Sequence, residues 1–331
     1  MDKQINNPTI SVIMSAYNSE KYIAEAIKSI LNQTFKDFEL IIFEDGSTDN
    51  TKKIVQKYSK KDKRIIPVYN KKNIGYVGFI KNLNKGLKIA KGKYIARMDA
   101  DDISLPERFQ IQYDFLEKHK EIFLVGSFMI AISEKNDELG IRALPQKMNE
   151  IKKQIVHDNC IIHPSIFFRN ERDLMYREKI LYCEDYDFYL RLILQGKILE
   201  NLPILLVKHR FHEGAVSVTK QYKQKLFAKK SQEFYHSGLK KGEQKYQKFN
   251  PEEITSLEID LNQEKSFEIL TLGYLFKKNE MKEFRKYSAI YFKNYGLLNK
   301  MMFYHLISFL PVKFLEFIRK ILWGRELRWK N

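Results

Sequence analysis

The sequence has few cysteines and no long apolar run. Its 331 residues include only Cys160 and Cys183, which have neither the number nor the spacing of a disulfide framework or a zinc site. No window reaches the roughly 18 to 20 uninterrupted apolar residues that a transmembrane helix needs. Residues 1–8 also lack the charged and apolar regions of a secretory signal peptide. We therefore expect a cytoplasmic protein with reduced cysteines.

Acidic residues are scarce relative to basic ones, and the imbalance is uneven. The chain has 58 Lys and Arg against 41 Asp and Glu, a formal net charge of +17. Residues 201–331 hold 25 basic and 13 acidic residues, a net of +12, and residues 1–200 hold 33 and 28, a net of +5. This asymmetry predicts an anionic partner for the C-terminal part, either a membrane surface or a nucleic acid.

The first part of the chain alternates strand-like and helical patterns. Strands are predicted at residues 9–14, 38–43, 65–68 and 94–98, and helical spacing of apolar residues separates them. This order predicts an α/β fold with a largely parallel sheet and right-handed crossovers. In such sheets ligands bind beyond the carboxyl ends of the strands.

Polar segments follow three of these strands. They are residues 15–18, 45–49 and 99–102, and parallel strands would bring all three to one edge of the sheet. Residues 45–49 taken alone are as typical of a turn and helix start as of a binding site. Their coincidence at one edge favours a binding site.

The acidic segment 99–102 is the strongest single signal. Three carboxylates this close repel one another, and a bound cation is the simplest explanation. If the strand continues briefly, its period of two places Asp99 and Asp101 on the same side. Their hard oxygen ligands suit Mn²⁺ or Mg²⁺. Substrate phosphates commonly complete the coordination shell of such an ion. A nucleotide diphosphate substrate is therefore predicted, and a solvated acidic turn is the alternative.

Residues 11–18, 44–51 and 98–102 together resemble the nucleotide-sugar-binding half of family-two glycosyltransferases with the GT-A fold. The resemblance covers roughly residues 8–215, and several motifs occur in the right order. It implies a Rossmann-like nucleotide-binding sheet, mixed at its edge, followed by a C-terminal helical appendage. It also implies a bacterial inverting enzyme of surface polysaccharide or lipooligosaccharide synthesis.

The resemblance assigns residues to the donor nucleotide-sugar. It implies that Asp45 accepts a hydrogen bond from uracil, that Asp101 ligates the metal, and that Asp99 contacts the ribose or the metal shell. The expected cofactor is Mn²⁺ or Mg²⁺. The full set of residues expected to bind the donor is Ser15, Ala16, Tyr17, Asp45, Asp99, Ala100, Asp101, Arg210 and His212.

A second acidic pair, Glu184 and Asp185, opens a predicted helix that Gly196 ends. Acids in a first helical turn ordinarily stabilise the helix dipole or cap. The pair is, however, similar to the catalytic motif of the family. The resemblance therefore implies that Asp185 deprotonates the acceptor, that Glu184 orients the site, and that one in-line displacement inverts the anomeric centre.

The resemblance also implies an acceptor side. Residues 162–169 resemble the strand that lines the acceptor, which assigns His163 to sugar hydroxyls, and Asp102 is assigned to the acceptor as well. Residues 208–217 resemble a loop whose Arg210 and His212 meet the diphosphate or the metal, although Ala215 departs from the usual small hydroxyl residue. A surface or structural role is the alternative for each histidine.

The expected domains are a catalytic domain at 1–218, with a donor half at 8–102 and an acceptor half at 103–218, and a basic helical region at 219–331. Segment 299–329 alternates apolar and basic residues, which is typical of a helix in the interface of an anionic bilayer. Packing on the catalytic domain or in an oligomer is the alternative.

The sequence thus predicts a UDP-sugar-dependent hexosyl- or N-acetylhexosaminyltransferase. It would extend a saccharide or lipid-linked acceptor of a capsule, lipooligosaccharide or O-antigen, peripherally bound at the inner face of the cytoplasmic membrane. The alternative is a non-catalytic protein that binds membrane or nucleic acid through its basic C-terminal region, although no recognised nucleic-acid module is apparent. The sugar transferred remains open.

Overall fold

The computed structural model describes residues 7–212 and 220–257, together with 285, 288–289, 305–310 and 314. The chain divides into two compact units, Met1–Thr255 and Ser256–Asn331. The expected domain boundary at residue 218 therefore precedes this division. Most of segment 299–329, the expected amphipathic region, lies outside the described residues.

The N-terminal half is the parallel sheet that the sequence predicts. Its strands are β1 (Ile10–Ala16), β2 (Phe38–Glu44), β3 (Ile65–Tyr69) and β4 (Tyr94–Asp99), and its helices are α1 (Ile23–Leu31), α2 (Thr51–Ser59) and α3 (Tyr76–Ile89). β1 lies between β2 and β4 and is parallel to both, and β3 is parallel to β2. The strands predicted at 9–14, 38–43, 65–68 and 94–98 are confirmed.

The second half continues the sheet with mixed strand directions, in the order β3-β2-β1-β4-β8-β6-β9-β5, with β7 paired to β6. Its strands are β5 (Ile103–Ser104), β6 (Ile122–Ile132), β7 (Glu138–Arg142), β8 (Phe167–Arg169) and β9 (Ile198–Arg210). Its helices are α4 (Arg108–Lys118), α5 (Met148–Ile155) and α6 (Glu184–Leu194), with a 3₁₀ turn η1 (His163–Ser165). β8 is antiparallel to β4 and β6, so the sheet changes direction next to β4.

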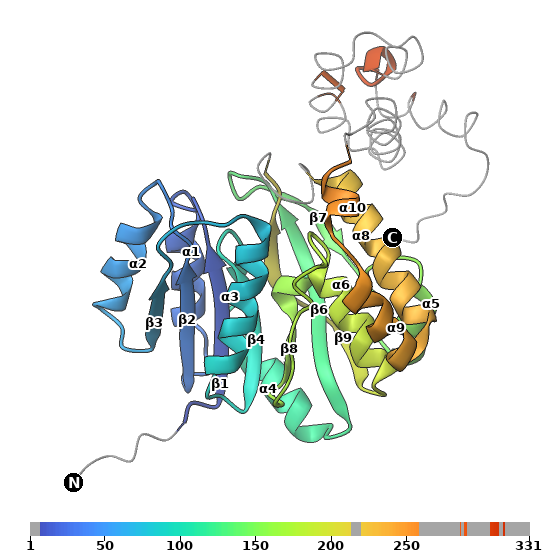
Figure 1. The fold of residues 1–331 in the computed structure, drawn as a ribbon. Helices are drawn as coiled ribbons and strands as arrows, with labels where there is room; N and C mark the ends of the chain where they lie inside the picture. Colours follow the sequence, from blue (N-terminus) through green and yellow to red (C-terminus); the bar gives the residue numbers. More distant parts are fainter. Residues whose placement is uncertain are drawn as a thin grey trace. The chain divides into compact units, whose positions relative to one another are not determined.

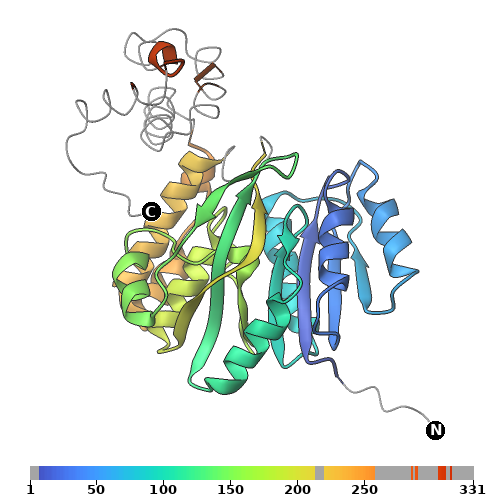
Figure 2. The ribbon, with the colours of Figure 1, turned by 180° about the vertical axis from the view of Figure 1, so that it is seen from behind.

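The two faces of the sheet have separate apolar cores. One contains Val12 and Met14 of β1 and packs against α1, α2 and α4. The other contains Ile13 of β1 and packs against α3, α5, α6 and α8. Figure 1 shows α3 and α6 in front of the sheet, and Figure 2 shows α1 and α4 from behind. The strand period of two thus sends alternate side chains of β1 and β4 to opposite faces.

Helices α8 (Gln221–His236), α9 (Gly238–Lys248) and α10 (Glu252–Thr255) complete the first unit. Phe227 and Phe234 of α8 are buried in the same core as α6. Among the described residues, no helix is both long and apolar enough to cross a membrane.

The strand predicted at residues 162–169 is wrong in its first half. Residues 162–169 were expected to be extended, but His163–Ser165 form a 3₁₀ turn and only Phe167–Arg169 pair as a strand. Pro164 has no N–H to donate to a neighbouring strand. The hydroxyl of Ser165 donates to the carbonyl oxygen of Ile162 at 2.7 Å, which closes the turn.

Candidate active site

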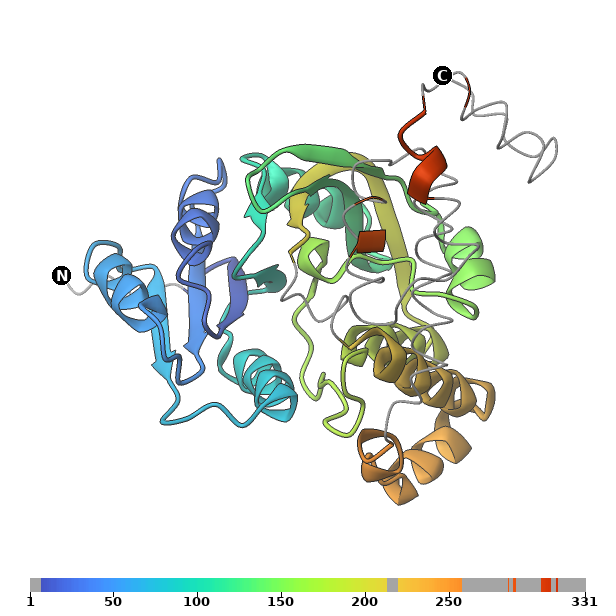
Figure 3. The ribbon, with the colours of Figure 1, turned by 90° about the horizontal axis from the view of Figure 1, so that it is seen from above.

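The carboxyl ends of β1, β2 and β4 meet at one edge of the sheet, as the parallel order predicts. Ser15 pairs with Asp99 of β4, and Ala16 pairs with Glu44 of β2. The backbone N–H of Asp45 donates to the carbonyl oxygen of Ala16 at 2.9 Å. Figure 3 views the sheet from this edge. Segments 15–18, 45–49 and 99–102 therefore converge.

Asp45 is fixed by asparagine amides. Its side chain is 2% exposed, and its two carboxylate oxygens accept hydrogen bonds from Asn70 at 2.6 Å and from Asn73 at 2.7 Å. The Asn70 amide also donates to Asn82 of α3, whose own amide donates to the hydroxyl of Ser15 at 3.1 Å. The carboxylate orientation is thus set by two amides of the loop between β3 and α3, and Asn82 of α3 supports one of them.

Gly46 permits this arrangement. Its φ is +68°, and a Cβ there would lie 2.7 to 2.8 Å from the backbone of Lys72 and Asn73. Only glycine allows both the left-handed turn and the close approach of the second loop. Beside this turn, Ala16 is buried, Ser15 is half-buried and Tyr17 is 45% exposed.

Asp99, Asp101 and Asp102 form a compact carboxylate cluster. One oxygen from each lies within 4.8 Å of the others. Both oxygens of Asp102 are already bonded, one to the backbone N–H of Arg210 at 2.8 Å and one to Nδ1 of His209 at 2.9 Å. Asp99 and Asp101 are partly exposed and offer the hard oxygen donors that Mn²⁺ or Mg²⁺ prefers. These two residues fit a divalent cation.

A basic side chain contacts each carboxylate of this cluster. Arg97 forms an ion pair with Asp99, and Nε2 of His212 lies 2.9 Å from an oxygen of Asp101. Burial raises the pKa of Asp99, and the negative charge of Asp101 acts in the same direction while Arg97 opposes both. The hydrogen bond to Asp101 raises the pKa of His212.

His209 is the basic residue that contacts the third carboxylate, Asp102. Burial lowers its pKa, but the charge of Asp102 and the hydrogen bond to it have the larger combined effect and raise the pKa to about 9. The imidazole is therefore protonated at neutral pH and forms an ion pair with the buried Asp102 carboxylate. Both carboxylate oxygens of Asp102, expected at the acceptor, take part in these bonds.

Arg210, expected at the diphosphate, is buried in a structural network. Its Nε donates to the backbone carbonyl of Asp101 at 2.7 Å, and Nη2 pairs with Glu25 of α1 at 2.8 Å. Nη1 donates to Asn136 at 2.6 Å, and the guanidinium lies 4.7 Å from the ring centroid of Tyr22. In this arrangement Arg210 supports the Asp101 backbone.

Glu184 and Asp185 begin α6 directly after Cys183, where the positive end of the helix dipole favours carboxylates. Glu184 is buried and accepts a 2.9 Å hydrogen bond from the hydroxyl of Tyr76. Asp185 is half-buried and accepts a 2.8 Å hydrogen bond from the amide of Asn159. Only Asp185 of this pair therefore presents solvent-accessible surface to a substrate.

Burial makes both carboxyl groups of this pair stronger bases. It raises the pKa of Glu184 to about 8, and the neighbouring Asp185 charge adds to the rise. Burial also raises the pKa of Asp185, while the backbone N–H of Tyr186, the charge of Arg97 and the Asn159 amide lower it. A carboxylate with a raised pKa accepts a proton more readily near neutral pH.

His163, expected at acceptor hydroxyls, is buried next to Glu184. It is 7% exposed, with Nε2 at 2.9 Å from the hydroxyl of Tyr176 and Nδ1 at 3.7 Å from Glu184. Burial, and after it the charge of Arg97, lower the pKa of His163 well below its usual value. The imidazole is therefore neutral.

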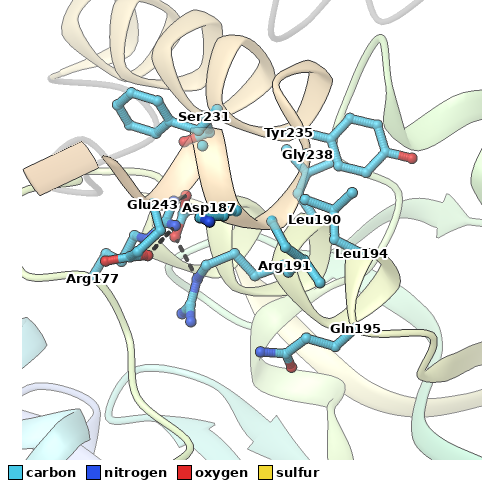
Figure 4. A pocket seen from close by; sticks show the side chains of 14 residues that line it. Arg177, Asp187, Leu190, Arg191, Leu194, Gln195, Ser231, Tyr235, Gly238 and Glu243 are labelled. Carbon is cyan, nitrogen blue, oxygen red and sulfur yellow. Dashed lines mark hydrogen bonds and ion pairs between the residues drawn. The ribbon is translucent and has the colours of Figure 1, made fainter. Parts of the chain in front are cut away.

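The far side of α6 is held by ion pairs. Asp187 is fully buried and pairs with Arg177 at 3.1 Å and with Arg191 at 3.0 Å, and Arg177 also pairs with Glu243 of α9. Figure 4 shows these side chains around a cavity of about 390 Å³ between α6, α8 and α9. This cluster fixes the helix whose first turn holds the second carboxylate pair.

Sequence reasoning missed several partners of the site. Arg97 stands two residues before Asp99, so the strand period could have placed both on one face. His209 is adjacent to Arg210 and carried no separate signal. Tyr76 and Asn159 are far from Glu184 and Asp185 in sequence, and no motif marks them.

The comparison with protein families decides the affiliation of the chain. The model for glycosyl transferase family 2 matches residues 11–183, which contain the cluster of Asp99, Asp101 and Asp102 and end directly before Glu184 and Asp185. The chain belongs to glycosyl transferase family 2. The expected family, the GT-A fold and the helical part after the sheet are confirmed. The protein is a glycosyltransferase.

Named relatives in this family include enzymes of glycan assembly. An uncharacterized glycosyltransferase of Methanocaldococcus jannaschii is 36% identical over 230 residues, 68% of this chain and 78% of that protein. The UDP-Glc:alpha-D-GlcNAc-diphosphoundecaprenol beta-1,3-glucosyltransferase WfaP of Escherichia coli is 33% identical over 215 residues, 64% of this chain and 80% of that protein.

Among solved structures, TarS of S. aureus in complex with UDP-GlcNAc has the same fold. Its TM-score is 0.55 at 21% sequence identity, and the match covers 91% of this chain and 89% of that chain.

Proposed function

We propose that this family 2 glycosyltransferase moves a hexose or N-acetylhexosamine from a UDP-sugar to a saccharide acceptor, with inversion at the anomeric carbon. The observation that carries the proposal is the presence of two carboxylate clusters in one compact unit, with the charge of the buried Arg97 acting on carboxylates of both. Asp99 and Asp101 lie at the end of β4, and Glu184 and Asp185 at the start of α6. WfaP, by its name, uses UDP-glucose, and the TarS structure holds UDP-GlcNAc.

On the donor side, Asp45 would accept the N–H of uracil, and Ser15, Ala16, Tyr17 and Ala100 would line the nucleoside. Asp99 and Asp101 would hold Mn²⁺ or Mg²⁺, with His212 beside Asp101. The cation, when bound, neutralises the negative charge that develops on the diphosphate of the leaving UDP.

On the acceptor side, Asp185 would act as the general base. Its carboxylate takes the proton of the acceptor hydroxyl while that oxygen attacks the anomeric carbon, and the bond from this carbon to UDP breaks on the opposite side. Glu184, held by Tyr76, orients the site. An α-linked donor would give a β-linked product.

We also propose that the acceptor belongs to a surface polysaccharide and is lipid-linked. A lipid-linked acceptor is what the name of WfaP indicates for that relative. The lysines of α8 and α9 support binding to an anionic membrane surface. The exposed lysines of these helices are Lys225, Lys229, Lys240, Lys241, Lys245 and Lys248. Cosedimentation with anionic vesicles, and its loss with neutral vesicles or high salt, tests this step.

The central test is UDP release from a panel of UDP-sugars, with and without Mn²⁺, in the absence of acceptor. Metal-dependent hydrolysis of one donor is expected, and Asp101→Ala should remove it. Asp114→Ala, at an exposed carboxylate of α4, is the matched control and should retain it. Absence of both hydrolysis and metal-linked UDP binding in the wild type would contradict the proposal.

A further inference from the structure

Arg97 is a buried cation between the two carboxylate clusters. It belongs to β4 and is 5% exposed. A buried guanidinium is costly unless it is paired, and its ion pair with Asp99 supplies one partner. Its Nε is buried and has no hydrogen-bond partner among the described residues. The side chain is thus only partly satisfied by Asp99.

The other side of Arg97 faces α3 and, beyond it, α6. The guanidinium carbon lies 5.8 Å from the ring centroid of Phe79, and the Phe79 and Tyr76 rings are 5.1 Å apart. The hydroxyl of Tyr76 in turn donates to Glu184. A short series of contacts therefore joins the metal-binding carboxylate Asp99 to the acid pair on α6.

The charge of Arg97 also acts on this second pair directly. It lowers the pKa of both Glu184 and Asp185 against the larger effect of burial. The positive charge of Arg97 therefore acts on both carboxyls. The titratable and charged groups around Asp185 are Tyr76, Arg97, Tyr176, Cys183, Glu184 and Tyr189.

We propose that Arg97 is a positioning residue whose single fixed charge serves both halves of the reaction, by orienting Asp99 at the donor diphosphate and by keeping Asp185 ionised for the acceptor. This inference rests on the proposed roles of Asp99 and Asp185. It predicts that the two clusters are electrostatically coupled. When the negative charge of one carboxylate is removed, the positive charge of Arg97 is less compensated and lowers the pKa of the other carboxylate further.

The test follows the protonation of Asp185 by infrared titration of the ¹³C-aspartate-labelled protein without metal, with Asp185→Asn used to identify the signal. Arg97→Met should raise the midpoint of Asp185 by about one pH unit, and Arg97→Lys should keep it closer to the wild type. Asp99→Asn should shift it in the opposite direction, to lower pH. Arg169→Met removes another partly buried arginine, which bonds backbone carbonyls of α4 and β6, and should leave it unchanged.

A second readout covers the donor side. UDP titrated into each variant with Mn²⁺ should bind about tenfold more weakly to Arg97→Met than to Arg97→Lys. An unchanged Asp185 midpoint in both Arg97→Met and Asp99→Asn would overturn the coupling, whatever the UDP affinity. Failure of the proposed function has a different signature, since the wild type would then bind no UDP while the midpoints still shift.

Arg97→Met could also fail to fold. In that case the comparison of Asp99→Asn with Arg97→Lys decides, because both variants keep a cation at residue 97. A midpoint that falls in Asp99→Asn supports the inference, and a midpoint that stays at the wild-type value overturns it.

Discussion

The two carboxylate clusters contain the same chemical groups in opposite surroundings. At the end of β4 each carboxylate contacts a basic side chain, in the pairs Arg97 with Asp99, His212 with Asp101 and His209 with Asp102. At the start of α6 the direct partners are neutral, namely the Tyr76 hydroxyl and the Asn159 amide. A charged partner favours the ionised form of a carboxylate, as Arg97 does at Asp99 against the larger effect of burial. At the start of α6, burial raises the pKa of both carboxyls. The first environment suits metal and phosphate binding, and the second suits proton transfer.

The largest expected effect separates these two tasks. Asp185→Asn should lower the rate of sugar transfer to the acceptor by about 10² to 10⁴-fold, because the amide cannot accept the proton. The affinity for UDP with Mn²⁺ should change far less than this rate, since Asp185 is on α6 and is coupled to Asp99 through the charge of Arg97. Transfer kinetics together with a UDP titration check both parts. A loss of UDP affinity as large as the loss of rate would contradict separate roles for the two clusters.

A second prediction removes a cation from the first cluster. His209→Gln should lower the free energy of unfolding by about 2 kcal/mol near pH 6, because the buried Asp102 carboxylate loses its ion pair. The pKa of His209 in the folded protein, about 9, is above its unfolded value near 6.5. The stabilisation is therefore complete below about pH 6.5 and disappears as the pH rises through 9. Urea unfolding of both proteins across this range, with EDTA present, measures the difference, and a constant gap would contradict it.

A third prediction weakens the second cluster. Tyr76→Phe deletes the hydroxyl that donates to Glu184, at a cost of about 1 kcal/mol, or roughly fivefold in kcat. Loss of a donor to the ionised form should raise the pKa of Glu184 further. Because ionised Glu184 orients the site, the acid limb of the pH profile of kcat reports Glu184 together with the base Asp185, and it should move to higher pH. Tyr69→Phe, at an exposed tyrosine of β3, is the matched control, and equal profiles for the two variants would show that the Tyr76 bond has no such role.

The smallest expected effect concerns the nucleoside side. Asn73→Ala removes one of the two amides that hold Asp45. We expect UDP affinity to fall by about fivefold, the equivalent of about 1 kcal/mol for one hydrogen bond, with kcat changed little. A cytidine diphosphate titration in parallel should show a smaller loss, because cytosine offers no ring N–H to Asp45. Equal losses for the two nucleotides would argue against an interaction of Asp45 with the base.

The parallel half of the fold could be predicted from the sequence because its signals are local. Strands β1 to β4 each show a short apolar run, and the polar residues that end them meet at one edge for topological reasons. The second half could not be ordered in this way. The pairing of β9 with β6 and β5 joins segments that are far apart in the chain, and no local pattern fixes their register.

The candidate site shows the same limit. The strand period predicted that Asp99 and Asp101 lie on one side, but β4 ends at Asp99, and a turn at residues 100–101 brings the two carboxylates together. Tyr76 meets Glu184 across 108 positions, and His209 meets Asp102 across 107. The sequence predicted that Arg210 contacts phosphate, but no local pattern could indicate that Nη2 of Arg210 pairs with Glu25 of α1. Sequence motifs do not predict contacts that form only when distant segments of the chain pack together.

The buried network of Arg210 bears on how such enzymes can be recombined. Its guanidinium, at the end of the second half, bonds Asp101 and Glu25 in the first half, and β5 pairs with β9 beside it. A chimera that joins the first 102 residues of this chain to the remainder of a relative would therefore separate Arg210 from its partners Asp101 and Glu25. To keep these bonds, such a chimera has to take the strand that ends at Arg210 from the same protein as the first 102 residues.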